Sequence, residues 1–314
     1  MYYPYFRGKQ FELVLLRERA MFIASNPINP IIEFVKDNSS SVQRVLSKLV
    51  EYNAKFTIVI NPLYGELKGE QAKILSFIED FIPPRYDNLS LGYIVNPDTN
   101  MEHLRHTLDI GASDSFSIIH YGYADGQKLS AETNNCRKVK THIFIDNYTS
   151  KLYQRHFRRD DVQRVLVRDG FRRTKNELYP PNEHFSDLHI TFEDENMDGF
   201  GDFLIVGDEY REAGGPAYAI AIHLTYLNAE EDMFIMHFKS ERTGSPVDPA
   251  GKFLEAVEKL VTELDRRGTL LFCSDACNEY RELFENSHFP GLGYAKKLSM
   301  QHHLELLADF LNRH

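Results

Sequence analysis

The chain is predicted to fold as an α/β protein, a (β/α)8 barrel of the TIM-barrel kind whose last two units are irregular and decorated. Three observations predict this. Six short apolar runs with strand character recur about every 30 residues over the first 147 residues. Helical apolar spacing fills most of the intervals, which indicates parallel strands joined by crossovers. No glycine-rich dinucleotide fingerprint follows any of these strands, which favours a barrel over a doubly wound sheet.

The first half of the chain follows this pattern closely. A serine cluster suited to helix capping precedes apolar residues spaced i, i+3, i+4 and i+7, from Val42 to Leu49. Pro83 and Pro84 end the helix that follows the third strand. Strands are expected over residues 2–6, 30–35, 56–60, 89–95, 115–119 and 141–145.

The regularity breaks after Asn147, and two assignments compete for the seventh strand. One is 165–167. The other is a hairpin, 219–226 with 233–238, followed by an eighth strand at 269–272. The hairpin is preferred because it leaves the predicted helix at 249–267 as an ordinary crossover.

A single barrel-like domain is therefore expected over residues 1–314. It divides into regular βα units over 1–147, an irregular insertion and hairpin over 148–248, and a closing βα unit with C-terminal helices over 249–314.

Composition restricts the functional classes. The 314 residues are 42% hydrophobic and 26% charged with a net charge of -10, which argues for a globular protein and against nonspecific coating of nucleic acid. The three cysteines form no CxxC pair, and neither a signal peptide nor a membrane span is recognisable, so a cytoplasmic protein is expected. A basic strip from Arg155 to Lys175 is explained most simply as a solvated face, and is otherwise a surface for nucleic acid.

Polar residues at the ends of the predicted strands define a candidate site. In a barrel these ends meet at the one face where active sites are built. Glu33, His120 and Asp146 could act as catalytic acids and bases, or hold a divalent cation together with Asn61. They are expected to converge. The remaining candidates would bind a small anionic ligand, and they are Arg7, Lys9, Lys36, Asn61, Asn96, Asp208, Arg211, His223 and His237.

The segment from residue 194 to residue 202 matches the D-x-N-x-D-G start of a calcium loop. Its ligands would be Asp194, Asn196, Asp198 and Asp202, but Ile205 stands where the bidentate glutamate is required. A glycine-rich turn that delivers phenylalanines to the core explains the same residues. Both interpretations stay open.

Glycine residues surround a charged segment from Gly207 to Gly215. Since the adjoining apolar runs, 203–206 and 219–226, are expected to be buried strands, this segment is expected to form an ordered lip over the barrel mouth. Asp208 and Arg211 would then face the pocket, and valine in place of Gly214 or Gly215 would harm folding if the backbone there needs a positive φ angle.

Four blocks carry a resemblance to a known family: YPYFRGKQFE, NPIIEFVKD, IVINP and GFGDFLIVGDEYREAGGPAYAIAIHLTY. Together they resemble the phage-type beta protein family and its uncharacterised bacterial relatives. The resemblance implies a barrel-like fold without an established activity. It also implies a two-protein bacterial system directed against mobile elements such as phages, in which the partner is a small restriction-endonuclease-like protein.

Two functions are consistent with these observations. The first is a ligand-binding or regulatory subunit that recognises a small phosphorylated or anionic ligand and holds a nuclease-like partner. The alternative is a stand-alone, metal-assisted hydrolase that uses Glu33, His120 and Asp146. We prefer the first because no set of residues has the fixed spacing of a known hydrolytic mechanism.

Overall fold

A computed structural model describes residues 1–110, 113–212, 214–215 and 217–314. Its internal contacts divide the chain into two compact units. The barrel unit comprises 1–168 and 191–202, and the second unit comprises 169–190 and 203–314.

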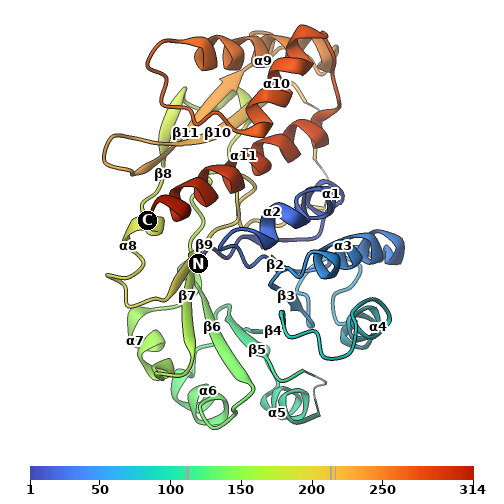
Figure 1. The fold of residues 1–314 in the computed structure, drawn as a ribbon, viewed down its shortest axis with the longest axis vertical. Helices are drawn as coiled ribbons and strands as arrows, with labels where there is room; N and C mark the ends of the chain where they lie inside the picture. The colour runs from blue at the N-terminus through green and yellow to red at the C-terminus, as the bar shows by residue number, and fades with distance from the viewer. Residues whose placement is uncertain (111–112, 213, 216) are drawn as a thin grey trace. The chain divides into compact units, whose positions relative to one another are not determined.

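The barrel unit contains an eight-stranded sheet in which every pair of neighbouring strands is parallel. An additional bridge between Tyr2 and Phe200 joins the first strand to the last, so the barrel is nearly closed (Figure 1). The predicted TIM-barrel-like fold is confirmed. The strands, in sheet order, are β1 (Tyr5–Phe6), β2 (Ile31–Ile32), β3 (Phe56–Val59), β4 (Leu89–Val95), β5 (Phe116–His120), β6 (Val139–Ile145), β7 (Gln163–Val167) and β9 (Gly199–Gly201).

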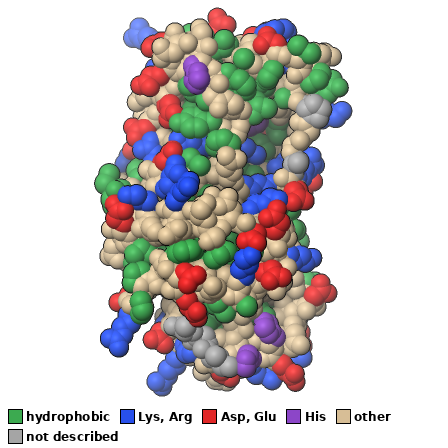
Figure 2. All heavy atoms as spheres, turned by 90° about the vertical axis from the view of Figure 1, so that its right-hand side faces the viewer, with side chains coloured by type: hydrophobic (Ala, Val, Ile, Leu, Met, Phe, Trp, Pro, Cys, Tyr) green, Lys and Arg blue, Asp and Glu red, His purple; other side chains and the backbone are tan. Residues whose placement is uncertain are grey.

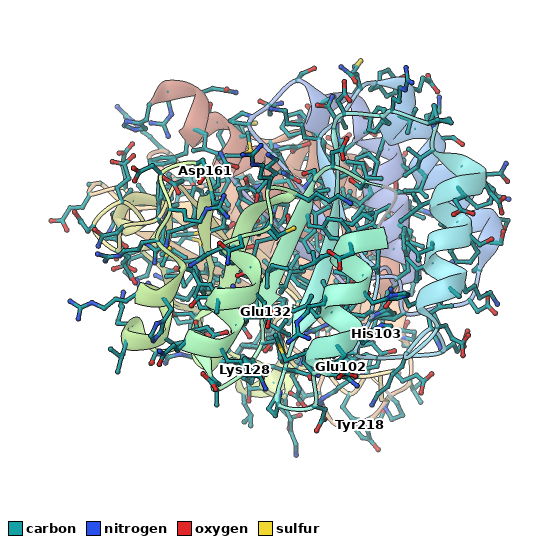
Figure 3. The ribbon with its side chains drawn as sticks, turned by 90° about the horizontal axis from the view of Figure 1, so that it is seen from below. Glu102, His103, Lys128, Glu132, Asp161 and Tyr218 are labelled. Atoms are coloured by element: carbon teal, nitrogen blue, oxygen red, sulfur yellow. The ribbon has the colours of Figure 1, made fainter. Side chains whose placement is uncertain are left out.

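Helices alternate with these strands and bury an apolar face. In α3 (Ser39–Glu51), the Asn38 side chain accepts a hydrogen bond from the backbone N–H of Ser41, and the residues spaced as predicted are buried. Arg105 of α5 (Met101–Ile110) forms an ion pair with Glu132 of α6 (Gly126–Thr133). Figure 3 labels Glu132 and, on α5, Glu102 and His103. The other helices of this unit are α1 (Gln10–Glu18), α2 (Ala20–Ala24), α4 (Gln71–Phe81) and α7 (Lys151–Gln154), with 3-10 turns η1 (Asp146–Tyr148) and η2 (Arg155–Phe157).

The preferred assignment of the last two barrel strands was wrong. The seventh strand is β7, which the rejected alternative had placed at 165–167, and the eighth is β9. Residues 269–272 form no strand, and 203–206 form a turn. The sequence signal of β9 was weak because the strand has only three residues, two of them glycine.

The glycines of β9 make room for Tyr3, which lies just before β1. A Cβ atom on Gly201 would lie 2.1 Å from the backbone oxygen of Tyr3, and one on Gly199 would lie 3.0 Å from the Tyr3 ring. The Tyr3 hydroxyl donates to Oε1 of Gln163 on β7 at 3.1 Å. Tyr3 therefore occupies space that side chains on β9 would otherwise fill.

The second unit contains a three-stranded antiparallel sheet in the order β10 (Ala221–Leu227), β11 (Met233–Lys239), β8 (Asn182–Ser186). The predicted hairpin therefore forms, but in this unit and not in the barrel. One core unites β10 with three helices through buried residues that include Leu224, Phe253 and Tyr280. The helices of this unit are α9 (Pro249–Asp265), α10 (Asp275–Glu285) and α11 (Leu292–Arg313); η3 (Asn176–Leu178) also lies in it, and α8 (Leu188–Thr191) spans the boundary.

Surface charge agrees with the composition. Figure 2 shows lysine and arginine side chains interspersed with aspartate and glutamate side chains over one face. Within the described part of the chain, none of the helices combines the length and apolar character that crossing a membrane requires.

Replacing Gly201 by alanine tests the packing of Tyr3 against β9. The new methyl group would overlap a backbone oxygen, which cannot rotate away, so we expect Gly201→Ala to destabilise the fold by about 2 kcal/mol or more. Gly244→Ala is the matched control, because a Cβ atom there has nothing within 4 Å. Thermal unfolding measures both variants. Equal melting temperatures for the two would contradict the packing described here.

Candidate functional site

A buried carboxylate occupies the carboxyl end of β2. Glu33 is fully buried, and the hydroxyl of Tyr5 donates to its Oε2 at 2.9 Å. The backbone N–H of Leu63 donates to Oε1 at 2.7 Å. Nε of Arg7, which follows β1, lies 3.4 Å from Oε2 in an ion pair whose side chains are 6% and 1% exposed. Two neighbouring barrel strands thus place a buried cation against a buried anion.

Burial dominates the electrostatics of Glu33. It raises the pKa of this carboxyl above the usual value, while Arg7 and the hydrogen bonds from Leu63 and Tyr5 act in the opposite direction. The ordered partners fix the carboxylate in one orientation, which in turn fixes the guanidinium of Arg7.

Three tyrosines that sequence reasoning missed connect this ion pair to the surface. The guanidinium carbon of Arg7 lies 4.9 Å from the ring centre of Tyr64, whose hydroxyl is 3.4 Å from that of Tyr121. The Tyr121 ring stacks on Tyr148 with ring centres 4.2 Å apart, and Tyr148 is 44% exposed. We call Tyr64, Tyr121 and Tyr148 the tyrosine series. Their positions just after the third, fifth and sixth predicted strands were a usable signal.

Two asparagines expected to bind ligand have structural partners. Asn61 bridges β3 to β4, because its amide donates to the backbone oxygen of Ile94 and accepts from the Ile94 N–H, both at 2.8 Å. Asn96 accepts from the N–H of Asp98 at 3.0 Å and thereby orders the turn after β4.

The two lysines expected at the mouth have local contacts as well. Nζ of Lys36 forms an ion pair with Glu66 at 2.9 Å. Lys9 occupies the N-cap position of α1, where its backbone N–H is 3.4 Å from Oε2 of Glu12.

Asp146 belongs to a different charge network. Its carboxylate pairs with Nε of Arg168 at 2.7 Å, and the same guanidinium reaches Glu195 at 2.6 Å. Lys151 also pairs with Glu195. Asp146 is therefore held by Arg168, which it shares with Glu195, and no contact links it to Glu33 among the described residues.

His120 does not join Glu33, in contrast to the predicted convergence. Its Nδ1 lies 2.8 Å from the Tyr153 hydroxyl and its Nε2 lies 2.9 Å from Nδ1 of His142. Its ring stacks on Phe144 and packs on Phe157, so it lies between the sheet and the α7–η2 segment. Successive side chains along a strand point to opposite faces of the sheet. The next residue, Tyr121, is therefore the one that contacts Tyr64 and Tyr148.

Four other candidates lie in the second unit. Asp208 donates its backbone N–H to Oδ2 of Asp169 at 2.8 Å, and Arg211 pairs with Glu209 on the surface. His223 and His237 face each other across β10 and β11. Since the hairpin is not a barrel strand, the strand-end rule did not apply to these histidines.

The glycine predictions for this segment need correction. Only Gly207, at φ +78°, has the left-handed backbone among its described glycines. Gly214 and Gly215 have no positive φ, and nothing lies within 4 Å of a Cβ atom built on either. Part of the expected lip, residue 213, lies outside the described residues, as does the neighbouring residue 216.

The calcium-like loop is not arranged around a common centre. Asp198 accepts from the backbone N–H of Arg164 at 2.7 Å, whereas Asp202 accepts from the Tyr2 hydroxyl at 2.7 Å. Between them, residues 199–201 form β9. Asp194 is exposed, and Asn196 is exposed in a positive-φ conformation. Over the described ranges, no group of three or more histidine, cysteine, aspartate or glutamate side chains is placed to hold a metal ion.

The basic strip includes buried and paired residues and belongs to both units. Arg164 is buried, and Arg159 forms a bidentate pair with Asp161. Arg172, Arg173 and Lys175 belong to the second unit. The strip in the sequence is thus divided by burial, by pairing and by the boundary between the units.

Comparison with protein-family models, with curated proteins and with solved structures finds no match for this chain.

The buried His120–His142 pair predicts acid sensitivity. Burial, followed by Arg159 and Arg164, lowers the pKa of His142 from about 6.5 to about 3. Because the folded-state pKa is the lower one, the stabilisation is complete above pH 6.5 and is lost as the pH falls from 6.5 toward 3. At pH 5 the loss from His142 is about 2 kcal/mol relative to pH 7.5.

Urea unfolding at these two pH values checks this expectation. His142→Gln should have a pH dependence smaller by about that amount, whereas His184→Gln, at an exposed histidine, should behave like the wild type. An unchanged pH dependence in His142→Gln would contradict the assignment.

Proposed function

We propose that the carboxyl-terminal mouth of the barrel binds a small anionic ligand, with Arg7 as the group that recognises the anion. The observation that carries this proposal is the buried Arg7–Glu33 pair at the barrel face where active sites are found. A buried ion pair is expensive, and well-packed apolar residues would stabilise a fold equally well. Its place at the mouth therefore suggests a role in binding.

The contacts of Arg7 suit this role. Glu33 and the ring of Tyr64 hold the guanidinium from two directions, so little side-chain freedom would be lost on binding. A guanidinium has a planar set of donors that matches carboxylate and phosphate groups. The tyrosine series adds ring faces and hydroxyl groups between Arg7 and the exposed Tyr148. A ligand with an anionic group and a polar or aromatic body matches these contacts.

The geometry favours binding over the alternative, metal-assisted hydrolysis. Glu33, His120 and Asp146 were the residues expected to carry out hydrolysis, and each has its own separate partners. Acid–base catalysis requires such groups within hydrogen-bond reach of one reacting atom.

Thermal unfolding in the presence of inorganic phosphate, sugar phosphates and mononucleotides tests the proposal. A ligand that binds only the folded protein stabilises it by about 2.7 kcal/mol at a concentration of 100 times its Kd. We expect at least one of these anions to raise the melting temperature of the wild type, and Arg7→Met to abolish the increase.

Arg137→Met provides the control, because Arg137 is an exposed arginine of the same unit. It should keep the increase in melting temperature. If no anion stabilises the wild type, or if Arg7→Met responds as the wild type does, the proposed binding site is incorrect.

We further propose that this binding serves a two-protein bacterial system in which the chain regulates a nuclease-like partner. The support is the family resemblance of the four sequence blocks, whose first block includes Arg7. Coexpression with the product of the adjacent gene should give one complex of fixed ratio in size-exclusion chromatography. Two separate monomer peaks at micromolar concentration would refute the partnership and leave the ligand site untouched.

A further inference from the structure

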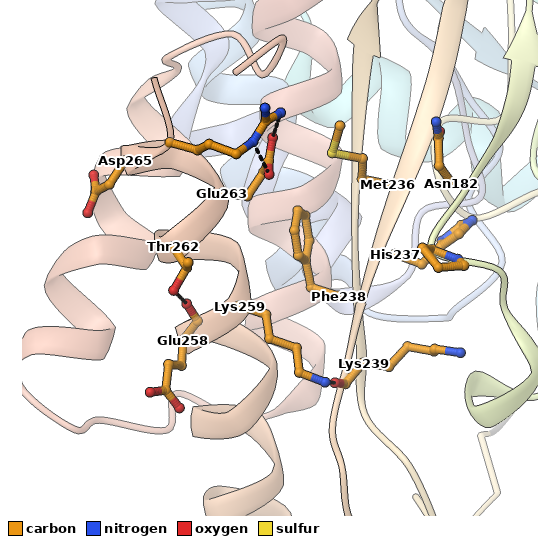
Figure 4. Close-up of a pocket in the computed structure, with 12 residues that line it drawn as sticks. Asn182, Met236, His237, Phe238, Lys239, Glu258, Lys259, Thr262, Glu263 and Asp265 are labelled. Atoms are coloured by element: carbon orange, nitrogen blue, oxygen red, sulfur yellow. Dashed lines mark hydrogen bonds and ion pairs between the residues drawn. The ribbon is translucent and has the colours of Figure 1, made fainter. Parts of the chain in front are cut away.

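Three titratable side chains form a line across the sheet of the second unit. Oε1 of Glu183, on β8, lies 3.1 Å from Nε2 of His237 on β11. Nδ1 of His237 lies 2.6 Å from Nδ1 of His223 on β10. The register of the strands produces this line, since His223 and His237 are directly paired. Figure 4 shows Phe238 directed toward α9 and His237 directed away from it, so the line lies on the other face of the sheet.

These contacts determine where the protons lie when both rings are neutral. A carboxylate can only accept, so Nε2 of His237 carries a proton and donates it to Glu183. The other nitrogen of neutral His237 then has a lone pair. The hydrogen bond between the rings consequently uses a proton on Nδ1 of His223, which leaves a lone pair on Nε2 of His223.

Aromatic rings fix both histidines. Tyr179 stacks on His237 with ring centres 4.5 Å apart, and its ring meets His223 edge-on at 4.7 Å. Phe171 contacts His223 edge-on at 5.2 Å. The His237 side chain is completely buried, whereas His223 is partly exposed. His223 is thus the more exposed of the two residues, and for this reason it is the one assigned to meet an external reactant.

The charges around these rings are predominantly positive. Lys239 donates to the backbone oxygen of Tyr179. Burial, and to a smaller extent the charge of Lys239, lower the pKa of His237 to about 4. Burial, His237 and then Lys296 lower the pKa of His223 well below its usual value. Burial raises the pKa of Tyr179, and the positive charge of nearby Arg173 acts in the opposite direction. His223 is thus neutral at pH 7 and lies in surroundings that favour an anionic reactant.

We propose that His223 is a phosphoryl-accepting nucleophile, oriented by His237 and Glu183. This role is independent of ligand binding at the barrel mouth. The arrangement is similar to a catalytic triad, in which a carboxylate orients a histidine and this histidine accepts the proton of the nucleophile. Here the nucleophile is a second imidazole.

The reaction is balanced with an activated phosphoryl donor as the co-reactant. The lone pair on Nε2 of His223 attacks phosphorus, an N–P bond forms, and the bond from phosphorus to the leaving group breaks with its electron pair. The proton on Nδ1 of His223 passes to Nδ1 of His237. His237 becomes an imidazolium, and His223 carries the phosphoryl group. Burial and Lys239 disfavour this cation, but the carboxylate of Glu183 and the negative charge of the new phosphoryl group offset them.

Phosphoramidate is a suitable probe because it donates a phosphoryl group and releases ammonia. The full chain is incubated with it at pH 7.5, and phosphohistidine is located by peptide mass spectrometry. We expect His223 to be labelled faster than the exposed His184 and His156. Glu183→Gln should slow the labelling of His223 by about tenfold or more, since a partner that orients a histidine typically contributes this much.

His184→Gln is the matched control, because His184 lies next to Glu183 on β8 and is exposed. It should leave the labelling of His223 unchanged. Nitrogen NMR of the wild type gives a second measurement that does not depend on a variant folding, and should show His223 protonated at Nδ1. Labelling of His223 no faster than that of His184, labelling that Glu183→Gln does not slow, or a proton on Nε2 of His223 would each overturn the proposal.

Discussion

Hydrogen bonds between the first strand and the last hold the barrel together. The backbone N–H of Tyr3 donates to the backbone oxygen of Phe200 at 2.8 Å, and the backbone N–H of Tyr5 donates to the backbone oxygen of Asp202 at 2.9 Å. Without them the sheet would have two open edges, each with unpaired backbone groups. The glycines of β9 are part of the same constraint, since the chain at Tyr3 approaches so closely that no other residue is accommodated at Gly201.

The candidate site is a consequence of this closure. The strand that pairs with β9 also carries Tyr5 and leads to Arg7, and both side chains contact Glu33 from the neighbouring strand. Arg7, the proposed anion-binding group, is thus held by backbone that the barrel itself makes rigid. In the second unit, strand register likewise aligns Glu183, His237 and His223. In both units the regular backbone, and not a loop, fixes the distances between polar groups.

The sequence predicted the first six strands and the alternation of strands and helices, because their apolar runs are long and regular. It failed for β9, whose three residues carry almost no side-chain signal. The strand-end rule located Arg7, Glu33 and Asn61 near the mouth, but a one-residue change in side-chain direction was enough to misplace His120. The line of Glu183, His237 and His223 could not be predicted, because it depends on pairing between segments far apart in the sequence.

The long separation between Tyr2 and Phe200 also affects how the protein is made. At the usual 5 to 20 residues per second, the ribosome adds the residues between them in about 10 to 40 s. During this time the nascent β1 cannot find its final neighbour, and the growing parallel sheet has a free edge that can pair with other chains. Barrel closure therefore comes late in synthesis. Because the last strand lies so far along the chain, the open edge of the sheet is accessible to chaperones and to other chains until that strand has been made.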